Sequence, residues 1–143
     1  MSIFDFWKPA WEKYPSPPVT PCDSEDDAQA QAFAAVTGNQ FVNKVAFTGS
    51  MLPTLQGGDM VLLDPVDFAT LQAGDIITYK AEWNPTFSNV CHRILLKDDA
   101  GWVASGDNNP HSEASWRVTP DNYHAKCVAV FRFPQPQPIV PST

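Results

Sequence analysis

The sequence of 143 residues is poor in basic side chains, in cysteine and in long apolar runs. Only 9 Lys and Arg stand against 16 Asp and Glu, which gives a formal net charge of −7. A protein that binds nucleic acid needs clustered cations to neutralise phosphates, so no nucleic-acid partner is expected. The cysteines, Cys22, Cys91 and Cys127, show no C-x-x-C spacing. They therefore predict neither a disulfide framework nor a zinc site, and they fit a reducing cytoplasm.

The chain also lacks the segments that direct proteins into membranes. No apolar run approaches the roughly 20 residues that a spanning helix needs. The first residues, MSIFDFWKPAWEKY, contain no basic stretch followed by an apolar one, so they do not predict a signal peptide. We therefore expect a chain that has no transmembrane segment.

Proline and aromatic residues mark the two ends of the chain. Residues 1–23 form an aromatic and Pro-rich arm, and residues 134–143 form a Pro-rich tail that cannot join a central strand. Within the arm, YPSPPVTPCD (14–23) is typical of a linker. The arm's aromatic side chains suit packing on the chain's own core or on another subunit, whereas a membrane-surface anchor would carry a basic face that this arm lacks.

Residues 24–133 read as one mainly β domain with a leading helix. The stretch SEDDAQAQAFAAVTGN predicts that helix, with Ser24 as its N-cap and Gly38 at its end. Short runs rich in β-branched and aromatic residues follow, separated by Gly, Pro, Asn and Asp. Their spacing predicts a small barrel or coiled sheet. The predicted strands are 41–47, 60–64, 75–80, 89–96, 101–105 and 124–133.

One turn raises the question of catalysis. Ser50 lies in a turn rich in Gly and Pro, where a serine is usually only a turn residue. A serine becomes a nucleophile when a base takes its proton, and His92, in the run VCHRIL, is a candidate. Asp107, in the turn GDNN, could orient that imidazole or simply cap its turn. The neighbouring Arg93 suits a structural ion pair with an acidic residue such as Asp59 or Asp75.

Several short motifs occur together in an order that resembles a known family. They are Ser-Met-Leu-Pro at 50–53, Gly-Asp at 58–59 and 74–75, His-Arg at 92–93 and Gly-Asp-Asn at 106–108. This series is similar to the signal-peptidase and LexA-like serine protease clan, and most similar to the archaeal and endoplasmic-reticulum type of signal peptidase catalytic subunit. The likeness covers about residues 45 to 130.

The resemblance implies a role for each matched position. Ser50 would be the nucleophile and His92 the general base. The Ser50 amide and the Thr48 hydroxyl would stabilise the oxyanion, and Asp107 matches the first acidic position of the Gly-Asp-Asn box. Met51, with Pro53, would shape the substrate floor beside the nucleophile, although both residues equally suit a core and a turn.

Two departures from the family pattern bear on these roles. The His-type enzymes carry a further Asp six residues after the one in the Gly-Asp-Asn box, and here that position holds Glu113. They also have a membrane helix before the Ser box, where this chain has an Ala-rich helix and an aromatic arm. This difference suggests a relative encoded by a virus or phage, in the cytoplasm or within a viral particle.

Two functions follow as hypotheses. The first is a serine endopeptidase that acts on proteins or peptides without a cofactor or metal. Because the signal-peptidase branch prefers Ala-x-Ala before the cut, the chain's own AQAQAFAA (28–35) is a candidate for self-cleavage. The second is a protease-like β domain, active or inactive, that serves as a structural subunit of a viral assembly, with its terminal arms contacting other subunits.

Overall fold

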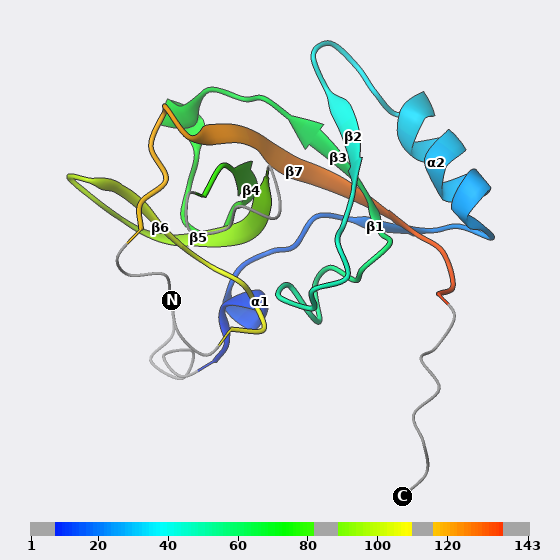
Figure 1. The fold of residues 1–143 in the computed structure, drawn as a ribbon, viewed down its shortest axis with the longest axis horizontal. Helices are drawn as coiled ribbons and strands as arrows, with labels where there is room; N and C mark the ends of the chain where they lie inside the picture. Colours follow the sequence, from blue (N-terminus) through cyan, green and yellow to red (C-terminus); the bar gives the residue numbers. More distant parts are fainter. Residues whose placement is uncertain (1–7, 82–88, 110–115, 136–143) are drawn as a thin grey trace, which may run out of the picture.

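One seven-stranded sheet dominates the computed structural model, which describes residues 8–81, 89–109 and 116–135 (Figure 1). The strand order is β2-β3-β7-β4-β5-β6, and β1 pairs with β7 beside this path. No pairing among the described strands joins β2 to β6, so the sheet is coiled and open, and the mainly β prediction is confirmed. The strands are β1 (Val19–Pro21), β2 (Phe41–Lys44), β3 (Met60–Asp64), β4 (Ile76–Tyr79), β5 (Val90–Asp98), β6 (Gly101–Ser105) and β7 (Tyr123–Arg132). The helical segments are α1 (Ala10–Lys13), α2 (Glu25–Ala34) and the 3₁₀ turn η2 (Phe68–Thr70).

Strand β7 is the centre of the sheet because it has partners along both edges. It pairs antiparallel with β3 on one side, while β4 and then β1 share the other side (Figure 1). The linker prediction for residues 14–23 is therefore wrong at β1, which pairs in parallel with Val130–Arg132 of β7. Proline is tolerated there because an edge strand needs hydrogen bonds on one side only. The Pro18 carbonyl accepts from Val130 N–H at 2.9 Å, and Cys22 N–H donates to the Arg132 carbonyl at 2.7 Å.

Helix α2 begins as the sequence predicts and ends earlier. Ser24 is the N-cap, and its hydroxyl accepts from the Asp27 amide at 3.1 Å. The helix ends at Ala34 rather than at Gly38, because Thr37 forms a turn with the Gln40 side chain instead of a further helical turn. The alanines that α2 buries allow it to lie close to β3 and β7. Among the described helices, none has the length and apolar character that crossing a bilayer requires.

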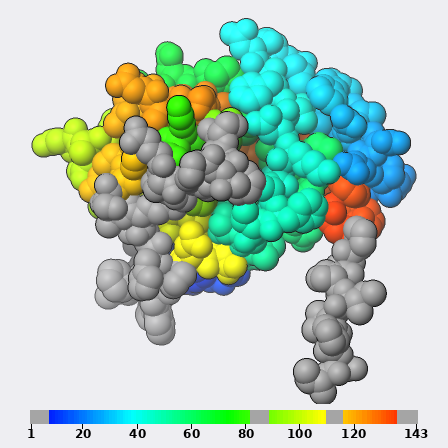
Figure 2. All heavy atoms as spheres, viewed as in Figure 1, coloured from blue at the N-terminus to red at the C-terminus, as the bar shows by residue number. Residues whose placement is uncertain are grey.

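Strand β3 is buried on both faces and separates two parts of the core. Met60 and Leu62 pack toward α2, while Val61 and Leu63 alternate to the opposite face. The second face packs against the turn that follows β2, at Met51 and Leu55. This turn, teal in Figure 2, is visible on the surface, while its side chains Met51 and Leu55 are buried against the sheet.

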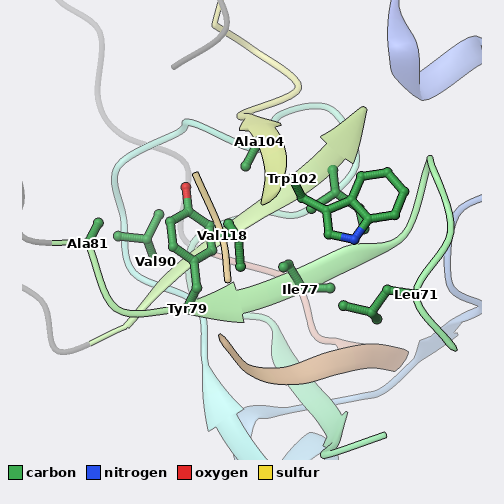
Figure 3. Packing of buried hydrophobic residues seen from close by; sticks show 9 residues of the cluster. Leu71, Ile77, Tyr79, Ala81, Val90, Trp102, Ala104 and Val118 are labelled. Carbon is green, nitrogen blue, oxygen red and sulfur yellow. The ribbon is translucent and has the colours of Figure 1, made fainter. Parts of the chain in front are cut away.

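A third cluster fills the coiled part of the sheet formed by β4, β5 and β6 (Figure 3). Its members are at most 7% exposed, and burying one of the large side chains contributes about 2 kcal/mol. Trp102 and Val118 also exchange backbone hydrogen bonds of 2.9 and 2.8 Å, which closes the cluster from the side of β6. The cluster consists of Leu71, Ile77, Tyr79, Ala81, Val90, Ile94, Trp102, Ala104 and Val118.

Candidate active site

Ser50 lies in the turn between β2 and β3, and the local backbone brings Thr48 against it. Gly49 has φ +73°, a conformation that favours glycine, and it lets the chain reverse just before the serine. The Thr48 hydroxyl donates to Ser50 Oγ at 3.3 Å and accepts from the Ser50 amide at 3.4 Å. These two bonds are long, so an incoming oxyanion could replace them at little cost. The two predicted oxyanion donors therefore lie side by side.

A pocket of about 460 Å³ opens beside this turn. Ser50, Thr48 and Met51 line it from the turn, and His92 lines it from β5. His92 is only 3% exposed, whereas Ser50 is half-buried, so the imidazole lies deeper than the hydroxyl. The fold thus brings a turn serine and a strand histidine onto the wall of one pocket.

Alternation along β5 sends two adjacent side chains to opposite faces of the sheet. Ile77 lies opposite His92, and Ile76 lies opposite Arg93. His92 consequently shares the face of the third cluster, while Arg93 shares the face on which the Ser50 turn packs. At its position, Nδ1 of His92 is 3.1 Å from the Tyr79 hydroxyl.

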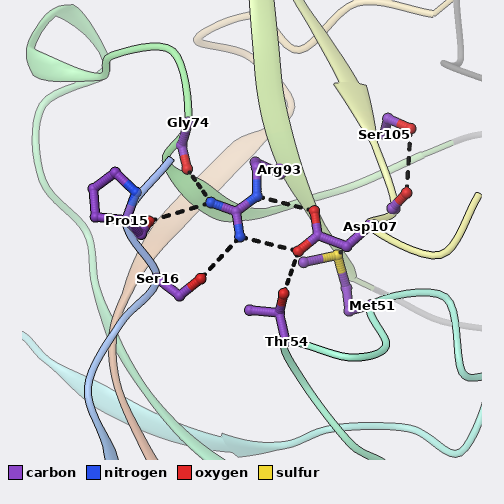
Figure 4. Close-up of polar contacts among 9 residues, drawn as sticks. Pro15, Ser16, Met51, Thr54, Gly74, Arg93, Ser105 and Asp107 are labelled. Atoms are coloured by element: carbon purple, nitrogen blue, oxygen red, sulfur yellow. Dashed lines mark hydrogen bonds and ion pairs between the residues drawn. The ribbon is translucent and has the colours of Figure 1, made fainter. Parts of the chain in front are cut away.

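Arg93 forms a buried, two-pronged ion pair with Asp107 (Figure 4). Its Nε and Nη2 donate to the carboxylate at 2.9 and 3.0 Å, and the Thr54 hydroxyl donates to the same carboxylate. The two side chains are 0% and 1% exposed. The prediction that Arg93 pairs with an acidic residue such as Asp59 or Asp75 is therefore wrong for both aspartates. Asp59 pairs instead with Arg132 and Asp75 with Lys126, and both partners belong to β7.

The segment that carries Asp107 packs against the Ser50 turn and is hydrogen-bonded to it. Asn108 N–H donates to the Ser50 carbonyl at 2.9 Å, and the Asn108 side-chain amide donates to the Gly49 carbonyl at 3.0 Å. A Cβ on Gly106 would approach the Ser50 carbonyl to 2.5 Å, so only glycine allows the segments this close. The Asp107 amide also points at the Met51 sulfur, 3.4 Å away. The Gly-Asp-Asn motif therefore fixes the backbone of the Ser50 turn.

The predicted site residues fall into three groups. Thr48, Ser50, Met51 and His92 all line the pocket, and Met51 is at once a core residue and part of the pocket wall. Pro53 is exposed in the turn, outside the lining of that pocket. Both carboxylate oxygens of Asp107 accept hydrogen bonds, Oδ1 from Arg93 and Oδ2 from Arg93 and Thr54.

Two further residues complete the account of the site. Glu113, the other carboxylate predicted to orient His92, lies outside the described residues. Sequence reasoning missed Tyr79, whose place in GDIITYK gives only a strand signal, because its contact with His92 depends on the register between β4 and β5.

Cysteine chemistry at this pocket is suppressed. Cys91 precedes His92 on β5 and lines the pocket. Burial, together with the nearby Cys127 and Asp107, raises the pKa of the Cys91 thiol well above its ordinary value. The Cys91 side chain is half-buried, and a thiol with a raised pKa stays neutral at pH 7 and is a poor nucleophile. In the part of the chain that the structure describes, no group of three or more His, Cys, Asp or Glu gathers as a metal site.

Nucleophilic catalysis at this site would require the Ser50 hydroxyl and the His92 imidazole to meet across the pocket that both residues line. Among the described residues, Ser50 Oγ is hydrogen-bonded to Thr48 and not to His92. Such contacts are often loose without substrate and tighten when it binds. A scan of protein-family models and searches of curated proteins and solved structures found no match to this chain.

Proposed function

We propose that this chain is a serine endopeptidase in which Ser50 attacks the peptide carbonyl and His92 takes the serine proton. The observation that carries the proposal is that Ser50 and His92, far apart in sequence, line one pocket. The Thr48 hydroxyl and the Ser50 amide would donate to the oxyanion of the tetrahedral intermediate. One preorganised donor of this kind is worth about 3 kcal/mol of barrier.

The expected substrate is an extended peptide with small side chains, as the resemblance to signal peptidases implies. The chain's own AQAQAFAA motif has a different conformation. Ala28 and Ala32 are fully buried within α2, packed against the sheet. Self-cleavage there would first require the helix to unfold, so substrates in other chains are the better candidates.

The competing function, a structural subunit of a viral assembly, depends on terminal arms that are available to neighbouring subunits. Part of the N-terminal arm is engaged within this chain. Its β1 residues pair with β7, and Pro15 and Ser16 both accept hydrogen bonds from Arg93. This observation favours the enzyme, since fewer arm residues remain to contact a neighbour.

The test is digestion of a peptide library, read by mass spectrometry, with the wild type and four variants. Ser50→Ala and His92→Gln should each lower the cleavage rate by at least about 10³-fold. Thr48→Val should lower it by about 100-fold, because one oxyanion donor is lost. His124→Gln is the matched control, since His124 is exposed on β7 and should leave the rate unchanged.

Two outcomes would contradict the proposal. One is full turnover by Ser50→Ala, which would show that another group is the nucleophile. The other is a folded wild type that cleaves no peptide of a broad library, which would favour the structural subunit.

A further inference from the structure

Pro15 and Ser16 of the N-terminal arm lie beside the buried guanidinium of Arg93 (Figure 4). A guanidinium has five N–H donors, and five hydrogen bonds engage them here. Three go to Asp107 and to the Gly74 carbonyl. The other two go to the arm, where the Pro15 carbonyl accepts from Nη1 at 3.3 Å and the Ser16 hydroxyl accepts from Nη2 at 3.2 Å. The arm thus completes the set of acceptors that allows Arg93 to be 0% exposed.

Tyr14 packs against the same place from the preceding position of the arm. A Cβ on Gly74 would lie 2.5 Å from the Tyr14 ring, so the ring rests directly on the backbone whose carbonyl accepts from Arg93. Three of the residues 15–18 are proline, which restricts φ and lowers the entropy that this segment loses when it is ordered. We call residues 14–16 the strap.

Arg93 connects the strap to the Ser50 turn. Both oxygens of Asp107 accept from Arg93, and the hydroxyl of Thr54, which lies in the turn, donates to the same carboxylate. The neighbouring Asn108 N–H donates to the Ser50 carbonyl at 2.9 Å. The strap residues are not among the described residues that line the pocket, so the strap acts on the pocket only through the groups beneath it.

We propose that the strap holds the Ser50 turn in the conformation that catalysis needs, and that displacing the strap lowers turnover at a pocket it does not touch. When the strap leaves, two N–H donors of Arg93 face water, and the ion pair with Asp107 loses its cover. A hydrated ion pair is screened and fixes geometry weakly, so Thr54 and the rest of the turn gain freedom. Cleavage of the arm, or its capture by another protein, would therefore switch the site off. The effect on turnover rests on the proposed function, whereas the effect on the turn does not.

The direct test is amide hydrogen exchange of the full chain, measured by NMR, in the double variant Tyr14→Ala/Ser16→Ala. The reporter is the Asn108 amide, because its acceptor is the Ser50 carbonyl. The reference is the Val118 amide, which is hydrogen-bonded at the third cluster. The reporter should exchange at least about tenfold faster than in the wild type, while the reference stays unchanged. An unchanged reporter, or an equal acceleration of the reference, would overturn the inference.

Single changes isolate the hydrogen bond of Ser16. Ser16→Ala removes one acceptor of Arg93 and should accelerate exchange at Asn108 about fivefold, whereas Ser16→Thr keeps the hydroxyl and should behave as the wild type. Exchange as fast in Ser16→Thr as in Ser16→Ala would contradict the role of this oxygen. Val19→Thr is the matched control on the same arm, because the Val19 side chain is 42% exposed on β1, and it should leave the reporter unchanged.

Peptide cleavage tests the consequence for turnover. The double variant Tyr14→Ala/Ser16→Ala should lower kcat about tenfold and leave KM within about twofold of the wild type, because the strap does not line the pocket. An unchanged kcat in a variant whose reporter exchanges faster would overturn the role of the strap in catalysis. A wild type that cleaves nothing, but whose Asn108 amide depends on the strap as expected, would contradict the proposed function alone.

Discussion

His92 and Arg93 are neighbours on β5, yet they lie in two very different environments. On one face the imidazole meets a neutral phenol within an apolar cluster. On the other face a guanidinium meets a carboxylate, and both are almost fully buried. The comparison indicates a division of labour: the charged face holds the serine turn in place, and the neutral face holds the imidazole. One strand thus carries the imidazole on one face and, through Arg93 and Asp107, supports the Ser50 turn on the other.

The largest loss of unfolding free energy should come from removing the ion pair between Arg93 and Asp107. Arg93→Met leaves Asp107 buried without its cation, and loss of one partner of such a pair costs about 3–5 kcal/mol of unfolding free energy. Urea denaturation followed by circular dichroism measures this cost. Tyr79→Phe, on the neutral face, should cost only about 1 kcal/mol. Equal losses in the two variants would refute the division of labour.

Raising the pH should lower the free energy of unfolding by a smaller amount. The group responsible is the thiol of Cys127, which lies on the same face as Arg93 and is too buried to ionise easily. Burial raises the pKa of Cys127 from 9.0 to about 12. The unfolded chain therefore loses the thiol proton at a lower pH than the folded chain does, and stability falls as pH rises from 9 toward 12. Cys127 alone should account for a loss of about 1 kcal/mol between pH 9 and pH 10, and Cys91, whose pKa is also raised, adds to it. Urea denaturation at each pH measures the loss.

Cys127→Ala should make that dependence on pH shallower, whatever its effect on stability at pH 7. Tyr123, whose pKa is raised from 10.0 to about 12 chiefly by burial, contributes mainly above pH 10. Tyr123→Phe therefore serves as the control between pH 9 and pH 10. A stability that stays constant over this interval in the wild type would contradict the prediction.

The smallest change in unfolding free energy should come from the exposed ion pair between Lys44 and Glu25. Lys44 Nζ lies 2.7 Å from Glu25 Oε1, but the two side chains are 45% and 50% exposed. Exposed pairs contribute about 0–1 kcal/mol, so Lys44→Ala should change the unfolding free energy by less than about 1 kcal/mol. The same urea titration at low and at high salt measures it. A loss as large as that of Arg93→Met would show that burial does not distinguish these pairs.

Local signals made much of this molecule predictable. Ser24 caps α2 because a side-chain oxygen there satisfies an amide within its own turn. Strand β3 is recognisable from MVLLD because its burial on both faces requires a continuous apolar run. The motifs around Ser50 and His92 likewise identified two residues that share a pocket.

Long-range pairing was not predictable from the chain alone. β1 has only three residues, one of them proline, so it gives no local strand signal, and it pairs because β7 offers it an edge. The partner of Arg93 depends on the approach of the Asp107 segment, and the partner of His92 depends on the register of β4. In each case the deciding contact joins residues that no short motif connects.

The pairing of β1 with β7 has a consequence for biosynthesis. The ribosome makes residues 19–21 early and their partners, residues 130–132, more than a hundred residues later. Until then the nascent polypeptide exposes an unsatisfied edge near Cys22, a position that chaperones can protect and that aggregation can exploit. Completion of this sheet therefore has to wait until β7 has been synthesised.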